Sequence, residues 1–82
     1  MTVFHNDNGQ DFNIVAVLNF NKQDQKEYEN SWQKQRAMLL ERNGEYVVAT
    51  YVGETSWGYG YYADGKKDAV RKFNEVVKEY VL

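Results

Sequence analysis

The chain has 82 residues and no cysteine, and 43% of its residues are hydrophobic. This length allows one domain with a single core and leaves no room for a linker or a second domain. The lack of cysteine excludes disulfides and thiolate metal sites, and the net charge of -2 gives no general attraction to nucleic acid or to anionic lipid. We therefore expect one small globular domain over residues 1–82 that is held together by packing alone.

The N-terminal sequence MTVFHNDNGQ lacks the basic and apolar regions of a secretory signal peptide. No apolar run in the chain approaches the roughly 20 residues that span a bilayer. We therefore expect a cytoplasmic protein with no membrane partner.

The first part of the chain predicts a hairpin. Residues 2–12 offer a short strand and an Asp-Asn-Gly turn. Residues 12–20 are rich in β-branched and aromatic residues, and Val15 and Val17 make the second face partly apolar as well. This pattern predicts a central strand covered on both faces, with a row of alternate residues on one side: Phe12, Ile14, Ala16, Leu18 and Phe20.

The middle of the chain permits two interpretations. Residues 22–42 contain no Gly, Pro or β-branched residue, so one helix can run to a C-terminal cap at Gly44. Alternatively, a helix over residues 24–34 is followed by a hairpin with a two-residue turn at Asn43 and Gly44. We favour the hairpin, because its register pairs Arg42 with Glu45, Leu40 with Val47 and Leu39 with Val48.

The end of the chain predicts a strand over residues 56–63 and a helix over residues 66–82. Asp64 precedes this helix and is expected to be its N-cap or a turn residue. Its apolar residues recur with the 3.6-residue period of a single stripe that includes Val70, Phe73 and Val77. We therefore expect an α+β fold, in which an antiparallel sheet of three to five strands carries the C-terminal helix on one face, with a middle helix in addition.

The stretch SWGYGYYADG, residues 56–65, suggests the site of function. Period-2 alternation predicts Trp57, Tyr59 and Tyr61 on one face of a strand, and Gly58, Gly60 and Tyr62 on the other. We expect the two glycines to receive the helix, which leaves the aromatic row free. Trp and Tyr dominate binding hot spots, so the expected partner-binding residues are Trp57, Tyr59 and Tyr61, with Trp32 and Tyr51 nearby.

No residue pattern indicates catalysis, and we expect neither enzyme activity nor a cofactor or metal site. His5 is the only histidine, so a nucleophile would have a single possible base. Residues 58–63 formally match a glycine-rich dinucleotide pattern, but no βαβ unit surrounds them. The spacing of Asp7, Asn8 and Asp11 is that of a turn, because the closing Glu of a calcium loop is missing.

The expected function is therefore a non-enzymatic module that binds a protein partner. A first alternative is a single-stranded nucleic-acid binder that stacks bases on the aromatic row and steers phosphates with Lys66, Lys67 and Arg71. The acidic body of the chain argues against nucleic acid. A second alternative is a small structural protein that self-associates, with a homodimer as the expected form.

The segment 41–73 resembles small, uncharacterised proteins of phages and mobile elements in Gram-positive bacteria. The shared features are an Asn-Gly hairpin, a W-G-x-G-x-Y strand and an A-x-x-x-F helix. The resemblance implies an accessory protein of the kind that inhibits or regulates a host or defence protein, and it carries no catalytic residues. The matching residues are Asn43, Gly44, Trp57, Gly58, Gly60, Tyr62, Ala69 and Phe73.

Overall fold

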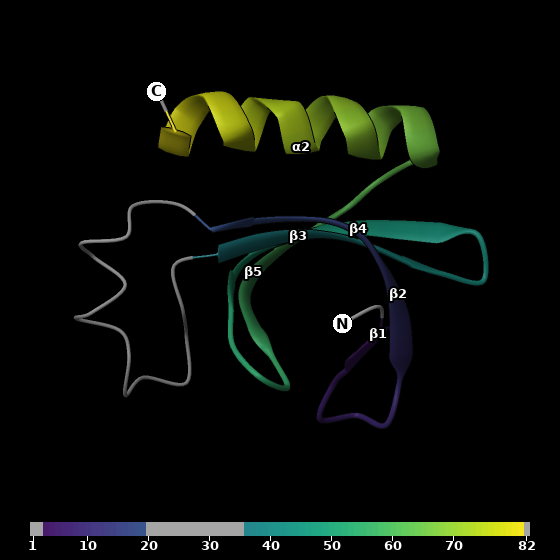
Figure 1. Ribbon diagram of the computed structural model, residues 1–82. Helices are drawn as coiled ribbons and strands as arrows, with labels where there is room; N and C mark the ends of the chain where they lie inside the picture. Colours follow the sequence, from purple (N-terminus) through teal and green to yellow (C-terminus); the bar gives the residue numbers. More distant parts are fainter. Residues whose placement is uncertain (1–2, 20–35, 82) are drawn as a thin grey trace.

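The computed structural model describes residues 3–19 and 36–81, which form one antiparallel sheet with a helix along it (Figure 1). The five strands of the described residues lie in the sheet in sequence order. The α+β class is therefore confirmed, whereas the predicted middle helix, residues 24–34, lies outside the described residues. The elements are β1 (Val3–His5), β2 (Asp11–Asn19), β3 (Arg36–Arg42), β4 (Glu45–Val52), β5 (Trp57–Tyr62) and α2 (Lys66–Val81).

The predicted hairpin with its turn at Asn43 and Gly44 is confirmed as β3 and β4. Its register pairs Arg42 with Glu45, Leu40 with Val47 and Leu39 with Val48, as the sequence predicts. Asn43 and Gly44 form the turn with φ of 54° and 83°. Two consecutive positive φ angles define a type I′ turn, whose twist matches that of the flanking strands.

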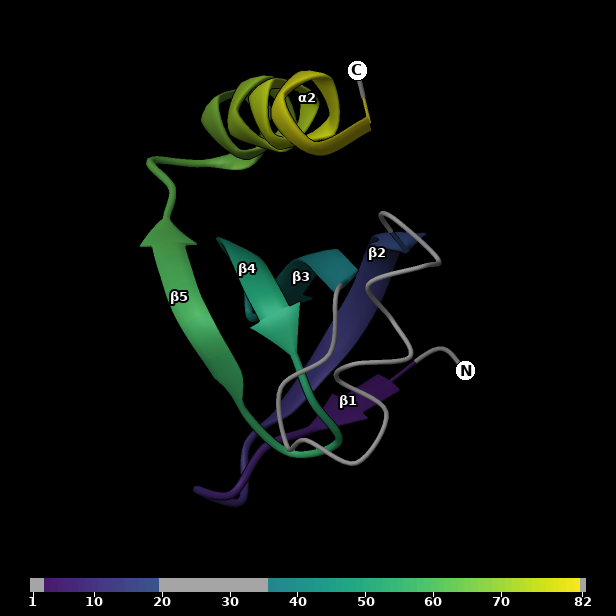
Figure 2. The same cartoon turned by 90° about the vertical axis from the view of Figure 1, so that its left-hand side faces the viewer.

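The sheet curls, so that its first and last strands approach each other on the face opposite α2 (Figure 2). The ring of Trp57 in β5 lies 5.7 Å from that of Phe4 in β1 and 5.6 Å from that of Phe12 in β2, measured between centroids. The N–H of Asp7 also donates to the carbonyl of Thr55 at 2.9 Å, which joins the loops next to these strands. We call this side of the sheet the inner face. Its buried residues are Phe4, Met38, Leu40, Val47, Ala49 and Val52.

The opposite side, here called the helix face, packs against α2 through a second core. Ala37, Leu39 and Val48 supply the sheet's part of this core, and Ala69 and Val76 supply the helix's part. Phe73 packs against these residues. The predicted stripe of α2 is therefore confirmed at its centre, although Val70 is 39% exposed at its margin. Within the described ranges, no helix is long and apolar enough to cross a membrane.

A β-bulge in β2 divides the predicted apolar row between the two faces. Ile14 pairs with Leu40 and Ala16 pairs with Leu39, so Val15 has no partner in β3. Ile14 accordingly packs on the inner face and Ala16 on the helix face. The expected coverage of both faces was wrong for Val15 and Val17, which are 49% and 52% exposed. The extra residue of a bulge reverses the side to which the following residues point.

A second reversal occurs in β4 at Tyr51, which has a φ of 54°. The pairing between β4 and β5 keeps its register, with Thr50 opposite Tyr59 and Val52 opposite Trp57. Thr50 nevertheless borders α2, whereas Val52 is buried in the inner core. A left-handed residue within a strand breaks the regular alternation of side chains. Trp57 follows its partner Val52 to the inner face.

Candidate binding surface on strand β5

The predicted aromatic row of β5 is not assembled. Trp57 packs in the inner core, whereas Tyr61 packs against α2 on the helix face. Trp57 and Tyr61 are four residues apart in β5, and they lie on opposite faces because the paired strand β4 reverses at Tyr51. Gly60 lies beneath the Trp57 ring, and a Cβ atom on Gly60 would stand 2.7 Å from the indole Nε1 atom. The expectation that Gly60 receives the helix was therefore wrong, because the space above it is taken by Trp57.

Tyr61, not a glycine, is the residue of β5 that holds α2. Its hydroxyl donates to the Asp68 Oδ2 atom at 3.0 Å, and the Nζ atom of Lys72 lies 5.3 Å from the centre of its ring. The same Asp68 oxygen accepts the N–H of Asp64 at 3.1 Å. The carbonyl of Gly65 accepts the first helical N–H, from Ala69, so Gly65 occupies the N-cap position and Asp64 lies one residue before it.

The charges around Tyr61 form one connected group. Arg71 donates to Asp68 at 2.7 Å and to Glu75 at 2.6 Å. Hydrogen bonds from Arg71, then from the Asp64 N–H and the Tyr61 hydroxyl, lower the pKa of Asp68. The hydrogen bond to Asp68 and removal from water raise the pKa of Tyr61. These basic and acidic side chains therefore satisfy each other between β5 and α2.

Tyr59 and Tyr51 come together on the helix face, away from Trp57. Both line a hollow of about 390 Å³ together with Thr50 and residues of α2 that include Lys72 and Val76. Tyr59 is 59% exposed. Of the predicted partner-binding residues, Tyr51 and Tyr59 line this one hollow. Tyr61 lies on the same face but packs against α2, and Trp57 lies on the inner face. Trp32 lies outside the described residues.

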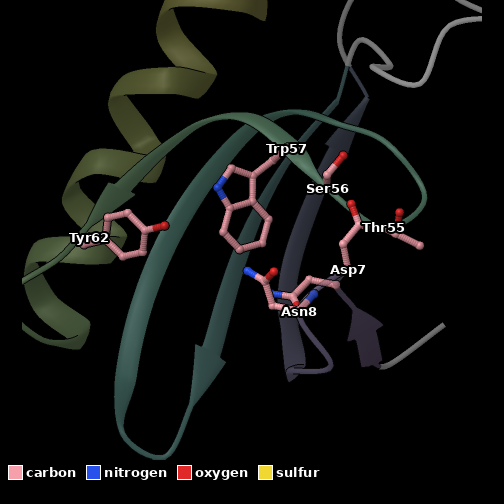
Figure 3. Close-up of a pocket in the computed structure, with 7 residues that line it drawn as sticks. Asp7, Asn8, Thr55, Ser56, Trp57 and Tyr62 are labelled. Atoms are coloured by element: carbon pink, nitrogen blue, oxygen red, sulfur yellow. The ribbon is translucent and has the colours of Figure 1, made fainter.

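A cleft on the inner face carries a residue that the sequence did not single out. Two adjoining hollows of about 250 and 230 Å³ share Trp57, Tyr62, Asn6 and Asn8, so they form one cleft. Tyr62 is 73% exposed. Figure 3 shows the rings of Trp57 and Tyr62 side by side, with the indole nitrogen and the phenol oxygen pointing toward each other. Alternation along β5 is enough to predict that Tyr62 and Tyr61 point to opposite faces. It does not predict that Trp57 lies on the face of Tyr62, because this depends on the reversal at Tyr51.

The outer edge of β5 has backbone groups with no partner strand among the described residues. The N–H of Ala63 donates to the carbonyl of Tyr46 in β4 at 3.0 Å. N–H groups of alternate strand residues point to the same side, so those of Gly60 and Tyr62 point away from β4. In the described part of the chain, β5 is the last strand of the sheet, and nothing pairs with this edge.

Polar side chains of the β1–β2 hairpin bond to each other. His5 is exposed, and its Nδ1 atom lies 2.6 Å from Asp11 across the β1–β2 hairpin. Among residues 3–19 and 36–81, no group of three His, Cys, Asp or Glu residues is placed to hold a metal ion. The surface of β5 is therefore the candidate for function.

Comparisons with protein-family models, with curated proteins and with solved structures gave no match to this chain. The function must therefore be inferred from the geometry of the described residues.

Proposed function

We propose that this protein is a non-enzymatic binding module that takes up an extended segment of a partner protein along the outer edge of β5. The observation that supports this proposal is an unprotected edge. The sequence of β5, WGYGYY, has no charged residue and no proline, and its outer side has no paired strand among the described residues. Natural sheets normally protect such edges with charges, prolines or bulges.

The side chains next to this edge suit a protein partner. Tyr59 on the helix face and Tyr62 on the inner face are 59% and 73% exposed. An added strand places its alternate side chains against both tyrosines, while its backbone bonds to the outward groups of Gly60 and Tyr62. Main-chain bonds supply affinity in this mode, and the two rings supply selectivity. The resemblance of residues 41–73 to small phage and mobile-element proteins supports a host or defence protein as the partner.

The nucleic-acid alternative receives less support from this geometry. Base stacking on a row needs Trp57, Tyr59 and Tyr61 on one face, but Trp57 and Tyr61 pack on opposite faces. Arg71 is already bonded to Asp68 and Glu75. We therefore prefer the protein partner.

Affinity selection from a random peptide library, followed by amide hydrogen exchange, tests the proposal. Bound peptides are expected to slow exchange at Gly60 and Tyr62, whose N–H groups point to the free edge. Tyr59→Lys is expected to weaken binding, because it places a charge beside the edge, and Tyr59→Phe is the matched control. Strand addition at β5 is wrong if bound peptides leave the exchange of both amides unchanged.

Self-association through the same edge is tested by a second experiment. A second copy can occupy the same edge, since two β5 strands are able to pair antiparallel. Light scattering of the protein alone decides this point. A mass above 9.7 kDa that returns to the monomer value in Tyr59→Lys assigns the edge to a homodimer instead of a foreign partner.

A further inference from the structure

The inner cleft is lined by two side-chain hydrogen-bond donors, the Trp57 indole N–H and the Tyr62 hydroxyl. No group in the described part of the chain accepts a hydrogen bond from the Trp57 indole N–H or the Tyr62 hydroxyl. The two groups point toward each other between the rings (Figure 3). An indole nitrogen is a donor only. A ligand that binds beside it therefore needs a hydrogen-bond acceptor.

The Trp57 ring is held rigidly in this cleft. Its tilted contact with Phe4 and its edge contact with Phe12 fix the plane of the ring. The ring also fills the space above Gly60, where a side chain would collide with it. A side chain fixed by its own packing loses little conformational freedom when a ligand binds. Trp57 is therefore a preorganised part of the site, whereas the exposed Tyr62 ring forms its open side.

We propose that this cleft binds a proline-rich segment in the polyproline II conformation. Such a segment has carbonyl oxygens that make no internal hydrogen bonds, and its prolines have no N–H to satisfy. Its carbonyls accept from Trp57 and Tyr62, and its pyrrolidine rings pack on the two aromatic faces. Aromatic-lined grooves with few polar groups are a recurrent way to recognise this conformation.

The spacing of the two positions along β5 suits this ligand. The Trp57 ring lies over Gly60, which precedes Tyr62 by two residues, a backbone distance of roughly 7 Å. One turn of a polyproline II helix is about 9 Å long. A single turn therefore contacts both rings at once.

Charge sets the direction of the bound segment. Asp7 lines one end of the cleft and has no ion pair within the described residues. Arg42 and Glu45 line the other end, where they are cross-strand neighbours whose charges offset each other. The end at Asp7 is therefore net negative, and the ligand carries a basic residue at that end.

This site shares Tyr62 with the free edge of β5, but it uses neither Tyr59 nor strand addition there. The cleft opens on the inner face of the sheet, whereas strand addition uses the outward backbone groups of β5. Tyr59→Lys, which disturbs the edge from the helix face, is expected to leave binding in the cleft unchanged. Failure of either proposal can thus be recognised without the other.

The test follows the indole N–H resonance of Trp57 by NMR during titration with synthetic peptides. The probes are a run of prolines preceded by two arginines and the same run preceded by two glutamates. Trp32→Phe assigns the resonance, since the chain has two tryptophans. We expect a saturable shift with the arginine peptide and weaker binding of the glutamate peptide, with a smaller difference between them in Asp7→Asn.

Tyr62→Phe removes one donor and keeps the ring, and it is expected to weaken binding about two- to tenfold, the usual effect of one neutral hydrogen bond. Tyr59→Phe removes the same group from the other face of β5 and is expected to have no effect. The proposal is overturned if neither peptide gives a saturable shift, or if Tyr62→Phe binds as well as Tyr59→Phe. A shift caused by chitohexaose and by neither peptide assigns the cleft to a saccharide instead.

Discussion

The indole ring of Trp57 lies over Gly60, with its Nε1 atom 2.7 Å from the position that a Cβ atom of residue 60 would occupy. The glycine therefore makes room for a side chain of its own strand. This contact brings Trp57 to Phe4 and Phe12 on β1 and β2, and it links the first and last strands of the curled sheet. The inner cleft depends on the same contact.

Gly60→Ala is expected to destabilise the domain, because the new methyl group displaces the Trp57 ring from its packing with Phe4 and Phe12. Overpacking of this kind costs about 1–3 kcal/mol, which urea unfolding followed by circular dichroism measures. In a Trp57→Leu background the same substitution is expected to cost less. Equal costs in both backgrounds would contradict the contact between the ring and residue 60.

Substitutions at Tyr51 are expected to depend on backbone conformation. Asn tolerates the left-handed region, whereas a β-branched residue does not. Tyr51→Asn is therefore expected to be more stable than Tyr51→Thr by about 1 kcal/mol, although both variants lose the same ring. Chemical denaturation of the two proteins measures the difference. Equal stability would show that φ at this position becomes negative when the tyrosine is replaced.

Arg36 fixes the end of β4 beyond the reversal at Tyr51. Its Nε atom donates to the carbonyl of Val52 at 2.8 Å, and its Nη2 atom donates to that of Gly53 at 2.5 Å. Partial burial lowers the pKa of Arg36, but a guanidinium remains charged. Arg36→Met is expected to lower the free energy of unfolding by about 1–3 kcal/mol, because hydrogen bonds from a charged donor are lost.

Arg71→Met is the matched control for Arg36. The bonds of Arg71 to Asp68 and Glu75 lie on the exposed surface of α2, and surface ion pairs contribute little to stability. A smaller loss is therefore expected in thermal unfolding. If Arg71→Met lowers the stability as much as Arg36→Met, the hydrogen bonds from Arg36 to the carbonyls of Val52 and Gly53 are not what stabilises the end of β4.

Asp68 is expected to make stability depend on pH in the acid range. Its pKa is lowered in the folded protein, first by Arg71 and then by the Asp64 N–H and the Tyr61 hydroxyl. A lowered folded-state pKa gives stability that is complete above the unfolded-state value and is lost as the pH falls through the folded-state value. The stability advantage of the parent over Asp68→Asn is therefore expected to shrink as the pH is lowered from about 6 to about 2.

An NMR titration of the Asp68 carboxyl in Tyr61→Phe supplies an independent check. This variant lacks one of the three hydrogen bonds to Asp68, so the pKa of Asp68 is expected to rise toward its ordinary value. An unchanged pKa would mean that Tyr61 does not hold α2 through this carboxylate.

Local features of the fold were predictable where one residue type determines the backbone. The Asn43–Gly44 turn was predicted because both residues accept positive φ, and the complementary residues on each side fixed the register. The helical period likewise identified α2. The candidate site was predictable only as a stretch of chain, since Tyr59 is exposed as expected whereas Trp57 and Tyr61 are separated.

The sequence by itself determined the class of fold, the β3–β4 hairpin with its register, and the strand that carries the candidate site. Only the tertiary structure decided which face each aromatic residue occupies. The physical reason is that alternation is a local rule, and the bulge at Val15 and the left-handed Tyr51 each reverse it. Neither valine nor tyrosine is a residue type from which such a backbone conformation can be predicted. The curl that these reversals accompany brings Trp57 to Phe4 and Phe12, and those contacts between distant strands place the cleft.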